Sequence, residues 1–307
     1  MNMMKGNKSV LVGALAISVA ASLWGLDGVI LTPQLYNLNV SFVVFLLHLI
    51  PFLIMNTFLY KRYKDVKLLS MKEGIAMFLV ALLGGALGTL SIVKALFLVN
   101  FNHLSIVILI QKLQPIFAIL LAAIILKERL SKRYILFGSL AILASYVLTF
   151  VFNVPSVETS TTPLLAIGYA LLAAISFGSS TVLSKIALNK IDFKTATFFR
   201  YGITSVIMLF ILLFNGHLCD FPIVTTNNWF ILILIGLTTG SGALFLFYYG
   251  LTRVRAIVST ICELFFPITA LLLDYLINDT LLSPIQWGAV LIMIGSILAL
   301  NISNDKR

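Results

Sequence analysis

Long apolar stretches, separated by short polar connections, run along the whole chain. A helix needs ~20 apolar residues to cross a bilayer core, and ten stretches approach or exceed this length. The connections between them reach only about a dozen residues, which leaves no room for a soluble domain. The predicted transmembrane helices are spans 1 to 10, at 9–31, 40–60, 74–98, 102–126, 133–151, 164–188, 194–214, 228–250, 255–277 and 284–302.

The composition fits an all-α polytopic membrane protein. Of the 307 residues, 60% are hydrophobic and 10% are charged, whereas a soluble globular chain has ~25% charged residues. An ordinary cytosolic enzyme, a secreted disulfide scaffold and a disordered chain are therefore excluded. Cys219 and Cys262 are too few for a disulfide framework and show no metal-binding or redox spacing. We expect no metal and no cofactor.

Lysine and arginine residues fall on one side of the ten-span arrangement. Of the 21, Lys94, Lys112 and Arg200 lie well inside spans, and the others lie in the termini, in the connections or at the span ends on one side. Cytoplasmic loops carry the excess of Lys and Arg, so the pattern predicts that both termini are cytoplasmic. The net charge of +10 therefore indicates orientation in the membrane, and we expect no nucleic-acid partner.

The two halves of the chain resemble each other. Five spans are an odd number, so a second copy must enter the membrane from the opposite side and form a 5+5 inverted repeat. We expect 1–152 and 153–307 to be these repeats, joined in one transport domain with alternating access about a central site. At an offset of 152 residues the matching pairs are Pro115 and Pro267, Gln111 and Glu263, and His48 and Arg200.

These features resemble the EamA branch of the drug/metabolite transporter superfamily. The motifs that carry the resemblance are Ser22-Leu23-Trp24-Gly25, Ser176-Phe177-Gly178, Phe198-Phe199-Arg200-Tyr201 and Leu126-Lys127-Glu128-Arg129-Leu130. The chain departs from the family pattern at two positions. Thr280 occupies the position in the second half that is equivalent to Glu128 of the acidic signature, and His48 stands where the family often has Arg. The resemblance implies a secondary transporter and favours efflux, but it leaves the substrate open.

Four charged residues inside the spans are candidates for gates. Asp27 and Lys94 share a depth near the outer ends of spans 1 and 3 and have opposite charges. Arg200 and Glu263 share a depth on the inner side, ~9–12 Å from the membrane surface at 1.5 Å per residue. Each pair is either a static salt bridge or a gate that opens when the pair breaks. Glu263 is alternatively a proton or cation site.

Lys112 is the first candidate for substrate binding. It lies near the middle of span 4 between Gln111 and Gln114, and no carboxylate remains at its depth once the two pairs are formed. Pro115 removes the backbone hydrogen bond to the carbonyl of Gln111 and opens a polar spot beside the amine. Such a site suits an anionic group. The alternative is a structural lysine whose partner is Glu263 or Asp27.

Four further residues are expected to contact the solute. Trp24, Tyr248 and Tyr249 are predicted to line the cavity, although aromatic side chains in a membrane chain often serve only packing. His48 falls in the middle of span 2, where it is either a hydrogen-bonded core group or a proton relay. Glu263, Gln111 and Gln114 complete the predicted site.

The sequence therefore predicts a secondary transporter of a small organic metabolite that bears a carboxylate or a phosphate. No Walker loop for ATP hydrolysis and no catalytic cluster occurs, so an enzyme is not expected. The alternatives are a carrier of neutral or cationic amphiphilic compounds and a lipid flippase. The expected location is a bacterial cytoplasmic membrane, with lipid and a small-molecule solute as partners, as a monomer or a homodimer.

Overall fold

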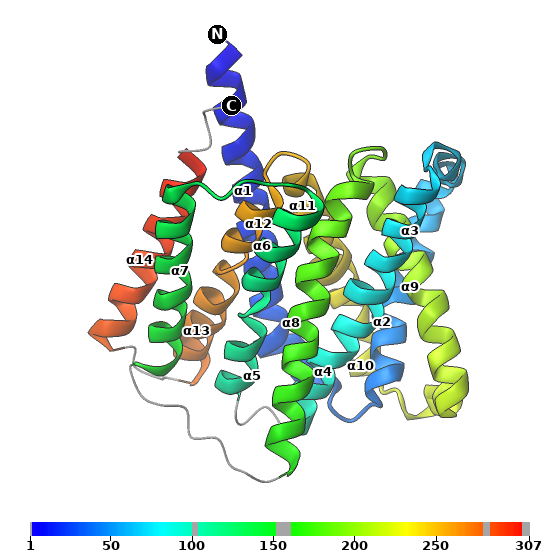
Figure 1. Cartoon of the computed structure of the whole chain (residues 1–307). Coiled ribbons are helices and arrows are strands. Elements are labelled where there is room, and N and C mark those ends of the chain that lie inside the picture. The colour runs from blue at the N-terminus through cyan, green and yellow to red at the C-terminus, as the bar shows by residue number, and fades with distance from the viewer. Residues whose placement is uncertain (1, 100–103, 152–160, 279–282, 303–307) are drawn as a thin grey trace.

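The computed structural model describes residues 2–99, 104–151, 161–278 and 283–302, and these are helical or lie in short connections (Figure 1). Eight helices are long and apolar enough to cross a membrane, and Gln114–Ile125 and Pro284–Leu300 are shorter apolar helices. The all-α membrane fold is thereby confirmed. The boundary between the predicted repeats at 152/153 and the Thr280 position lie outside the described residues.

Several predicted spans consist of two helices. The first half contains α1 (Asn2–Leu26), α2 (Val40–Leu59), α3 (Met71–Val80), α4 (Gly88–Leu98), α5 (Leu104–Gln111), α6 (Gln114–Ile125) and α7 (Lys132–Phe150). The second half contains α8 (Thr161–Ala187), α9 (Phe193–Asn215), α10 (Thr226–Ile235), α11 (Ser241–Leu251), α12 (Ala256–Cys262), α13 (Phe265–Asn278) and α14 (Pro284–Ile302).

Short polar side chains fix where several helices begin. Asn39, Ser131 and Asp192 accept hydrogen bonds from backbone N–H groups in the first turns of α2, α7 and α9. Ser70 and Thr225 form capping boxes at the starts of α3 and α10. The first N–H groups of a helix have no partner inside the helix, so these caps set the helix starts within the polar connections.

The helices are interrupted at matching places in the two halves. Spans 3 and 8 contain π-helical turns at Ala81–Leu87 and Gly236–Gly240. Span 4 breaks between α5 and α6, just before Pro115, which lacks the N–H that would continue the ladder. Span 9 breaks between α12 and α13, just before Pro267. The breaks place Lys112 and Glu263 at irregular backbone, as is common at transporter sites.

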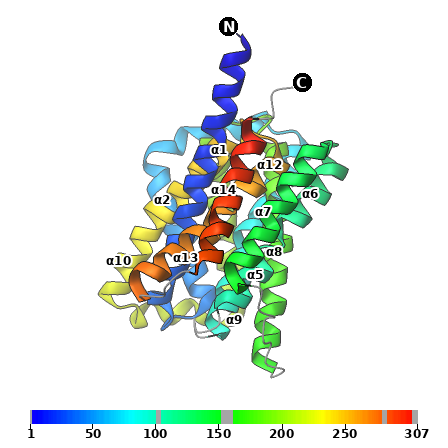
Figure 2. The ribbon, with the colours of Figure 1, turned by 90° about the vertical axis from the view of Figure 1, so that its left-hand side faces the viewer.

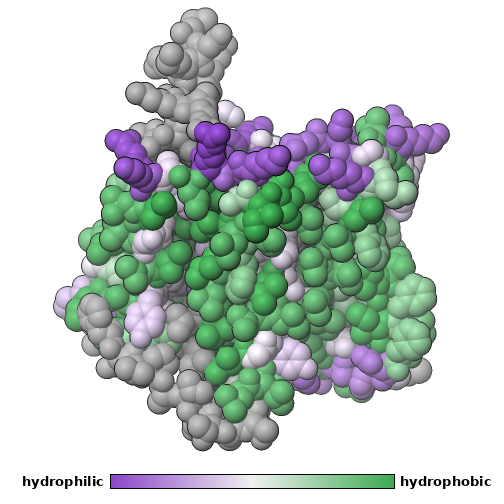
Figure 3. Space-filling view, viewed as in Figure 1, coloured by the Kyte–Doolittle hydropathy of each residue, from purple (hydrophilic) through white to green (hydrophobic). Residues whose placement is uncertain are grey.

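The two halves run through the membrane in opposite directions. α1 descends from the upper face of Figure 1, whereas α8, the first helix of the second half, ascends towards it. The upper face, where α1 begins and α14 ends, is here named the terminal face. Hydrophilic residues form a band across it, and the sides below are mostly hydrophobic (Figure 3). The cytoplasmic position of this face stays a prediction.

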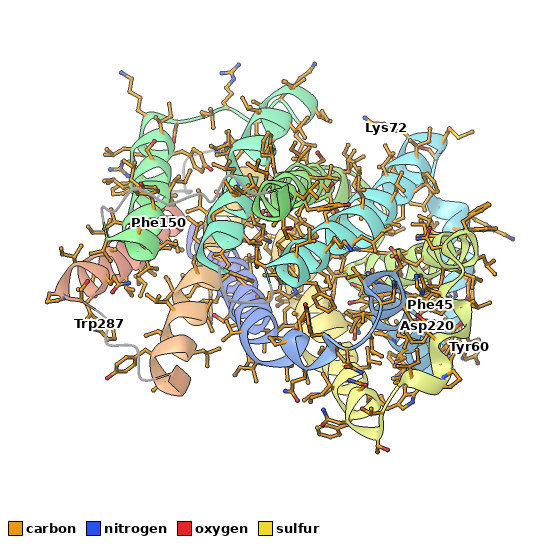
Figure 4. All side chains as sticks on the ribbon, turned by 90° about the horizontal axis from the view of Figure 1, so that it is seen from below. Phe45, Tyr60, Lys72, Phe150, Asp220 and Trp287 are labelled. Atoms are coloured by element: carbon orange, nitrogen blue, oxygen red, sulfur yellow. The ribbon has the colours of Figure 1, made fainter. Side chains whose placement is uncertain are left out.

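Spans 5 and 10 form a pair at one end of the molecule. α7 and α14 pack along each other, as Figure 2 shows from their side. In Figure 4, Phe150 of α7 and Trp287 of α14 lie at the periphery of the bundle. Trp287 is exposed. The other eight spans surround the centre of the helix bundle.

Candidate functional site

A cavity of about 220 Å³ lies at the interface of the two halves. Among the described residues, its lining comes from spans 1 to 4 and 6 to 9, whereas α7 and α14 contribute none. Aromatic rings make up much of the wall. Its lining includes Trp24, Asp27, Thr32, His48, Thr89, Leu96, Gln111, Lys112, Gln114, Phe177, Ser180, Arg200, Tyr201, Thr239, Phe247, Glu263 and Phe266.

The cavity extends away from the terminal face. In span 1 the lining residues begin at Trp24 and continue to Thr32, near the opposite face. On the terminal side of the cavity, α1 and α11 pack closely at Gly13 and Gly250. A Cβ atom on Gly250 would overlap the backbone of Gly13, so glycine is required for this approach.

Three polar side chains also close the terminal side. The Glu128 carboxylate follows α6 and accepts hydrogen bonds from the backbone N–H groups of Ala256 (3.0 Å) and Ile257 (3.1 Å), at the start of α12. Tyr134 of α7 donates to the Ile257 carbonyl at 2.7 Å. Lys185 of α8 donates to the carbonyl of Leu251, the last residue of α11, and to that of Val254 at 2.6 Å. Two of these residues, Glu128 and Tyr134, join the first half to the second.

The breaks in spans 4 and 9 bring together Gln111, Lys112, Gln114 and Glu263, here named the break cluster. Gln114 Nε2 donates to Glu263 Oε2 at 2.6 Å. Gln111 Oε1 and Glu263 Oε1 are buried without a hydrogen-bond partner among the described residues. Lys112 Nζ lies 3.7 Å from the centroid of the Phe266 ring, a cation–π contact. All four residues line the cavity.

The ion pair expected between Arg200 and Glu263 is not formed. Arg200 Nη1 donates to the Tyr248 hydroxyl at 3.1 Å, and Nη2 donates to the Gly84 carbonyl at 2.8 Å. Gly84 lies in the π-helical turn of span 3, whose backbone approaches close enough to accept this bond. Arg200 therefore ties span 7 to spans 3 and 8, and its buried Nε has no partner among the described residues.

The outer ion pair is not formed either. Asp27 Oδ1 accepts a hydrogen bond from Thr32 Oγ1 at 3.1 Å, because the π-helical and 3₁₀ turns after α1 bring these two residues together. Lys94 is exposed and does not line the cavity. No salt bridge joins Asp27 to Lys94 in the described part of the chain. Asp27 itself lines the cavity.

His48 is anchored to its own helix. Its Nδ1 lies 2.8 Å from the Val44 carbonyl, and because a carbonyl only accepts, this nitrogen carries the proton in the bond. The ring lies 5.2 Å from the ring of Tyr201, another cavity residue. The geometry thus gives His48 a core hydrogen bond and a place in the lining, and a relay role stays a prediction.

The three predicted aromatic residues have different surroundings. Trp24 lines the cavity and packs against Phe247 at 5.4 Å between ring centroids. Tyr248 and Tyr249 are outside the described lining. Tyr248 is fully buried and holds Arg200, and Tyr249 lies under the Arg253 guanidinium at 3.5 Å. Successive helical residues point ~100° apart, so the pair could not share one wall.

Several cavity residues were not among the predicted site residues. Phe266 lies one helical turn after Glu263, and Phe247 follows the Gly-rich segment of span 8. Ser180 and Thr239 line the cavity with hydroxyl groups that have no partner among the described residues. A helical spacing of three or four residues from Glu263 or Phe177 would have indicated Phe266 and Ser180. Thr239 begins the Gly-rich segment Thr239-Gly240-Ser241-Gly242 of span 8, which is the sequence signal for it.

Comparison with known proteins gives matches along nearly the whole chain. The EamA-like transporter family matches residues 11–150 and 164–302. The riboflavin transporter ImpX of Fusobacterium nucleatum subsp. nucleatum is 50% identical over 290 residues, which cover 94% of this chain and 97% of that protein. A solved structure titled only as the crystal structure of a protein aligns with a TM-score of 0.68 at 15% identity, covering 95% and 96% of the two chains. This last likeness concerns the fold alone.

Proposed function

The chain belongs to the EamA-like transporter family, and from this premise we propose that it carries riboflavin across a bacterial cytoplasmic membrane. It is a secondary transporter and not an enzyme. The observation that carries the proposal is the 50% identity with a riboflavin transporter over 94% of this chain. The position of the chain in a bacterial cytoplasmic membrane is proposed on the same ground.

The chemistry of the cavity supports a flavin. Riboflavin combines a flat aromatic three-ring system with a polyol chain and has no net charge. Trp24, Phe177, Phe247 and Phe266 supply aromatic walls, which suit stacking or edge contacts with a flat ring. The unpartnered polar atoms at both the break cluster and Arg200 suit hydrogen bonding to the ring edge and the polyol.

The proposed transport uses alternating access. In this conformation the cavity extends towards the face opposite the termini, while Glu128, Tyr134 and Lys185 close the terminal side. With both termini in the cytoplasm, the cavity would face the outside. This is the conformation in which an external solute would enter, and we propose uptake, in place of the efflux that the family resemblance favoured, with the solute's own gradient or an exchanged solute as the source of energy.

A carboxylate- or phosphate-bearing solute is the second candidate, and Lys112 is the observation that favours it. The ammonium group reaches the cavity and contacts the Phe266 ring, and it forms no salt bridge in the described part of the chain. An anionic group would pair with it. Riboflavin 5′-phosphate separates the two candidates because it adds a phosphate to the same ring and chain.

In proteoliposomes, riboflavin uptake is expected to saturate and to show counterflow against riboflavin loaded inside. Riboflavin 5′-phosphate is expected to compete at least about tenfold more weakly, because the Glu263 carboxylate shares the cavity and a buried phosphate has a large desolvation cost. Uptake of the labelled flavin in the presence of each competitor measures this. Stronger competition by the phosphate, abolished by Lys112→Ala, would establish the second candidate instead.

A further inference from the structure

One oxygen of the Glu263 carboxylate accepts a hydrogen bond, and the other has no partner among the described residues. Oε2 accepts the 2.6 Å hydrogen bond from Gln114, a residue that is itself buried. Oε1 is buried without a partner among the described residues, and Glu263 lines the cavity. An unpaired buried acceptor lowers stability, and more so when it is charged. A ligand that brings an N–H or O–H donor to this oxygen removes the penalty.

A cationic hydrogen-bond donor shares the cavity with this acceptor. Phe266 follows Glu263 by three residues, at the start of α13, and Lys112 Nζ lies 3.7 Å from the centroid of its ring. Glu263 is within electrostatic reach of Lys112 but makes no salt bridge with it. The two helix breaks thus place an acceptor and a cationic donor within electrostatic reach of each other, in one cavity with aromatic residues in its wall.

We propose that the break cluster recognises the cyclic imide edge of the flavin ring, with Glu263 Oε1 accepting the imide N–H and Lys112 donating to an adjoining carbonyl. This proposal rests on the proposed function, and it identifies the part of the solute that the break cluster binds. In riboflavin this group is N3–H, which lies between the carbonyls at C2 and C4. Gln114 is a positioning residue, since it holds the carboxylate through Oε2.

The charges around Glu263 argue against a cationic ligand at this point. Lys112 and Arg200 both act on the carboxylate electrostatically, and a third positive charge would meet two like charges at short range. A neutral imide adds no charge and satisfies both the acceptor and the donor. A carbonyl-only or N-substituted ring would leave Oε1 unpaired, and sites built around such a bond reject analogues that lack the donor.

The test compares riboflavin with 3-methylriboflavin, in which a methyl group replaces the imide hydrogen. Binding to the purified full-length protein is followed by quenching of flavin fluorescence. We expect 3-methylriboflavin to bind wild type at least about tenfold more weakly than riboflavin, because it loses one charge-assisted hydrogen bond. In Glu263→Ala the riboflavin affinity is expected to fall and the ratio between the two flavins to approach one. Glu73→Gln, a carboxylate change outside the described cavity lining, is expected to keep the wild-type ratio.

Each outcome decides between the inference and its premise. Equal affinity of wild type for both flavins would overturn imide recognition and leave the riboflavin proposal standing. A methyl effect that persists unchanged in a folded Glu263→Ala protein would show exclusion by size and also overturn it. If Glu263→Ala does not fold, Gln114→Ala takes its place, because it releases the Glu263 carboxylate. The ratio of riboflavin affinity to 3-methylriboflavin affinity is then expected to be lower in Gln114→Ala than in wild type. If neither flavin binds wild type, the proposed function fails together with the inference.

Discussion

Replacing Glu128 with alanine is expected to open the terminal side of the transporter. The carboxylate joins the two halves through the N–H groups of Ala256 and Ile257, and Arg255 Nε lies 3.9 Å from it. These bonds exist only while α12 rests against the end of α6. Their loss is expected to weaken the closed state by about 2 kcal/mol, which corresponds to about a 30-fold shift in the equilibrium between closed and open.

The thiol of Cys262 reports this opening. It is fully buried in α12, and in a Cys219→Ser background its rate of labelling by a maleimide measures exposure of the terminal side. We expect labelling at least about tenfold faster in Glu128→Ala than in the Glu128 parent, together with slower net uptake. Asn39→Ala is the matched control, because the Asn39 side chain also caps a helix, α2, but accepts only from Ser41 of its own segment. Unchanged labelling in Glu128→Ala would show that this contact does not hold the closed state.

The substitution Gly84→Ala is expected to destabilise the protein strongly. A Cβ atom on Gly84 would overlap the side chain of Ser180 and approach Arg200 Nη2 at 3.1 Å. The backbone of span 3 would have to move away from α8, and the Arg200 bond to the Gly84 carbonyl would lengthen. Overpacking of this kind costs about 1–3 kcal/mol. We therefore expect a lower thermal unfolding midpoint in detergent and a marked loss of transport.

Gly74→Ala is the control for this substitution. Gly74 lies in α3 of the same span, and no atom lies within 4 Å of its added Cβ. Alanine there is expected to be neutral or to stabilise the helix by about 0.5–1 kcal/mol, because glycine is the poorer helix former. Equal unfolding midpoints for the two variants would show that the close approach of span 3 to α8 has no energetic consequence.

The membrane fold could be predicted because each of its causes is local. Apolar runs that match the bilayer thickness, polar caps such as Asn39 and Asp192, and the loss of an N–H at Pro115 all act within a few residues. The family matches at 11–150 and 164–302 agree with two repeats. The π-helical turns in spans 3 and 8 were not predicted, since they arise where the backbone bends to meet other helices.

The depth of a side chain in the membrane is easier to infer from sequence than its partner. The structure places Lys112, Gln111, Gln114, Glu263, Trp24 and His48 in the cavity lining. Arg200 and Glu263 share a depth, yet Arg200 binds Tyr248 and Gly84, and Glu263 binds Gln114. A position along a span gives one coordinate of a side chain, whereas pairing also needs the rotation of each helix and the order of the helices around the cavity.

Sequence patterns alone indicated ten membrane spans, an inverted second half with five spans of its own, and the charged residues inside the membrane. Hydropathy, charge and proline act through lipid, water and the nearest backbone, so neighbouring residues suffice to show them. The packing of distant helices sets which charges meet, places Tyr249 under Arg253 away from the cavity, and lets Glu128 bridge the halves. These contacts join residues from distant spans, and their partners depend on helix packing that no short stretch of sequence contains.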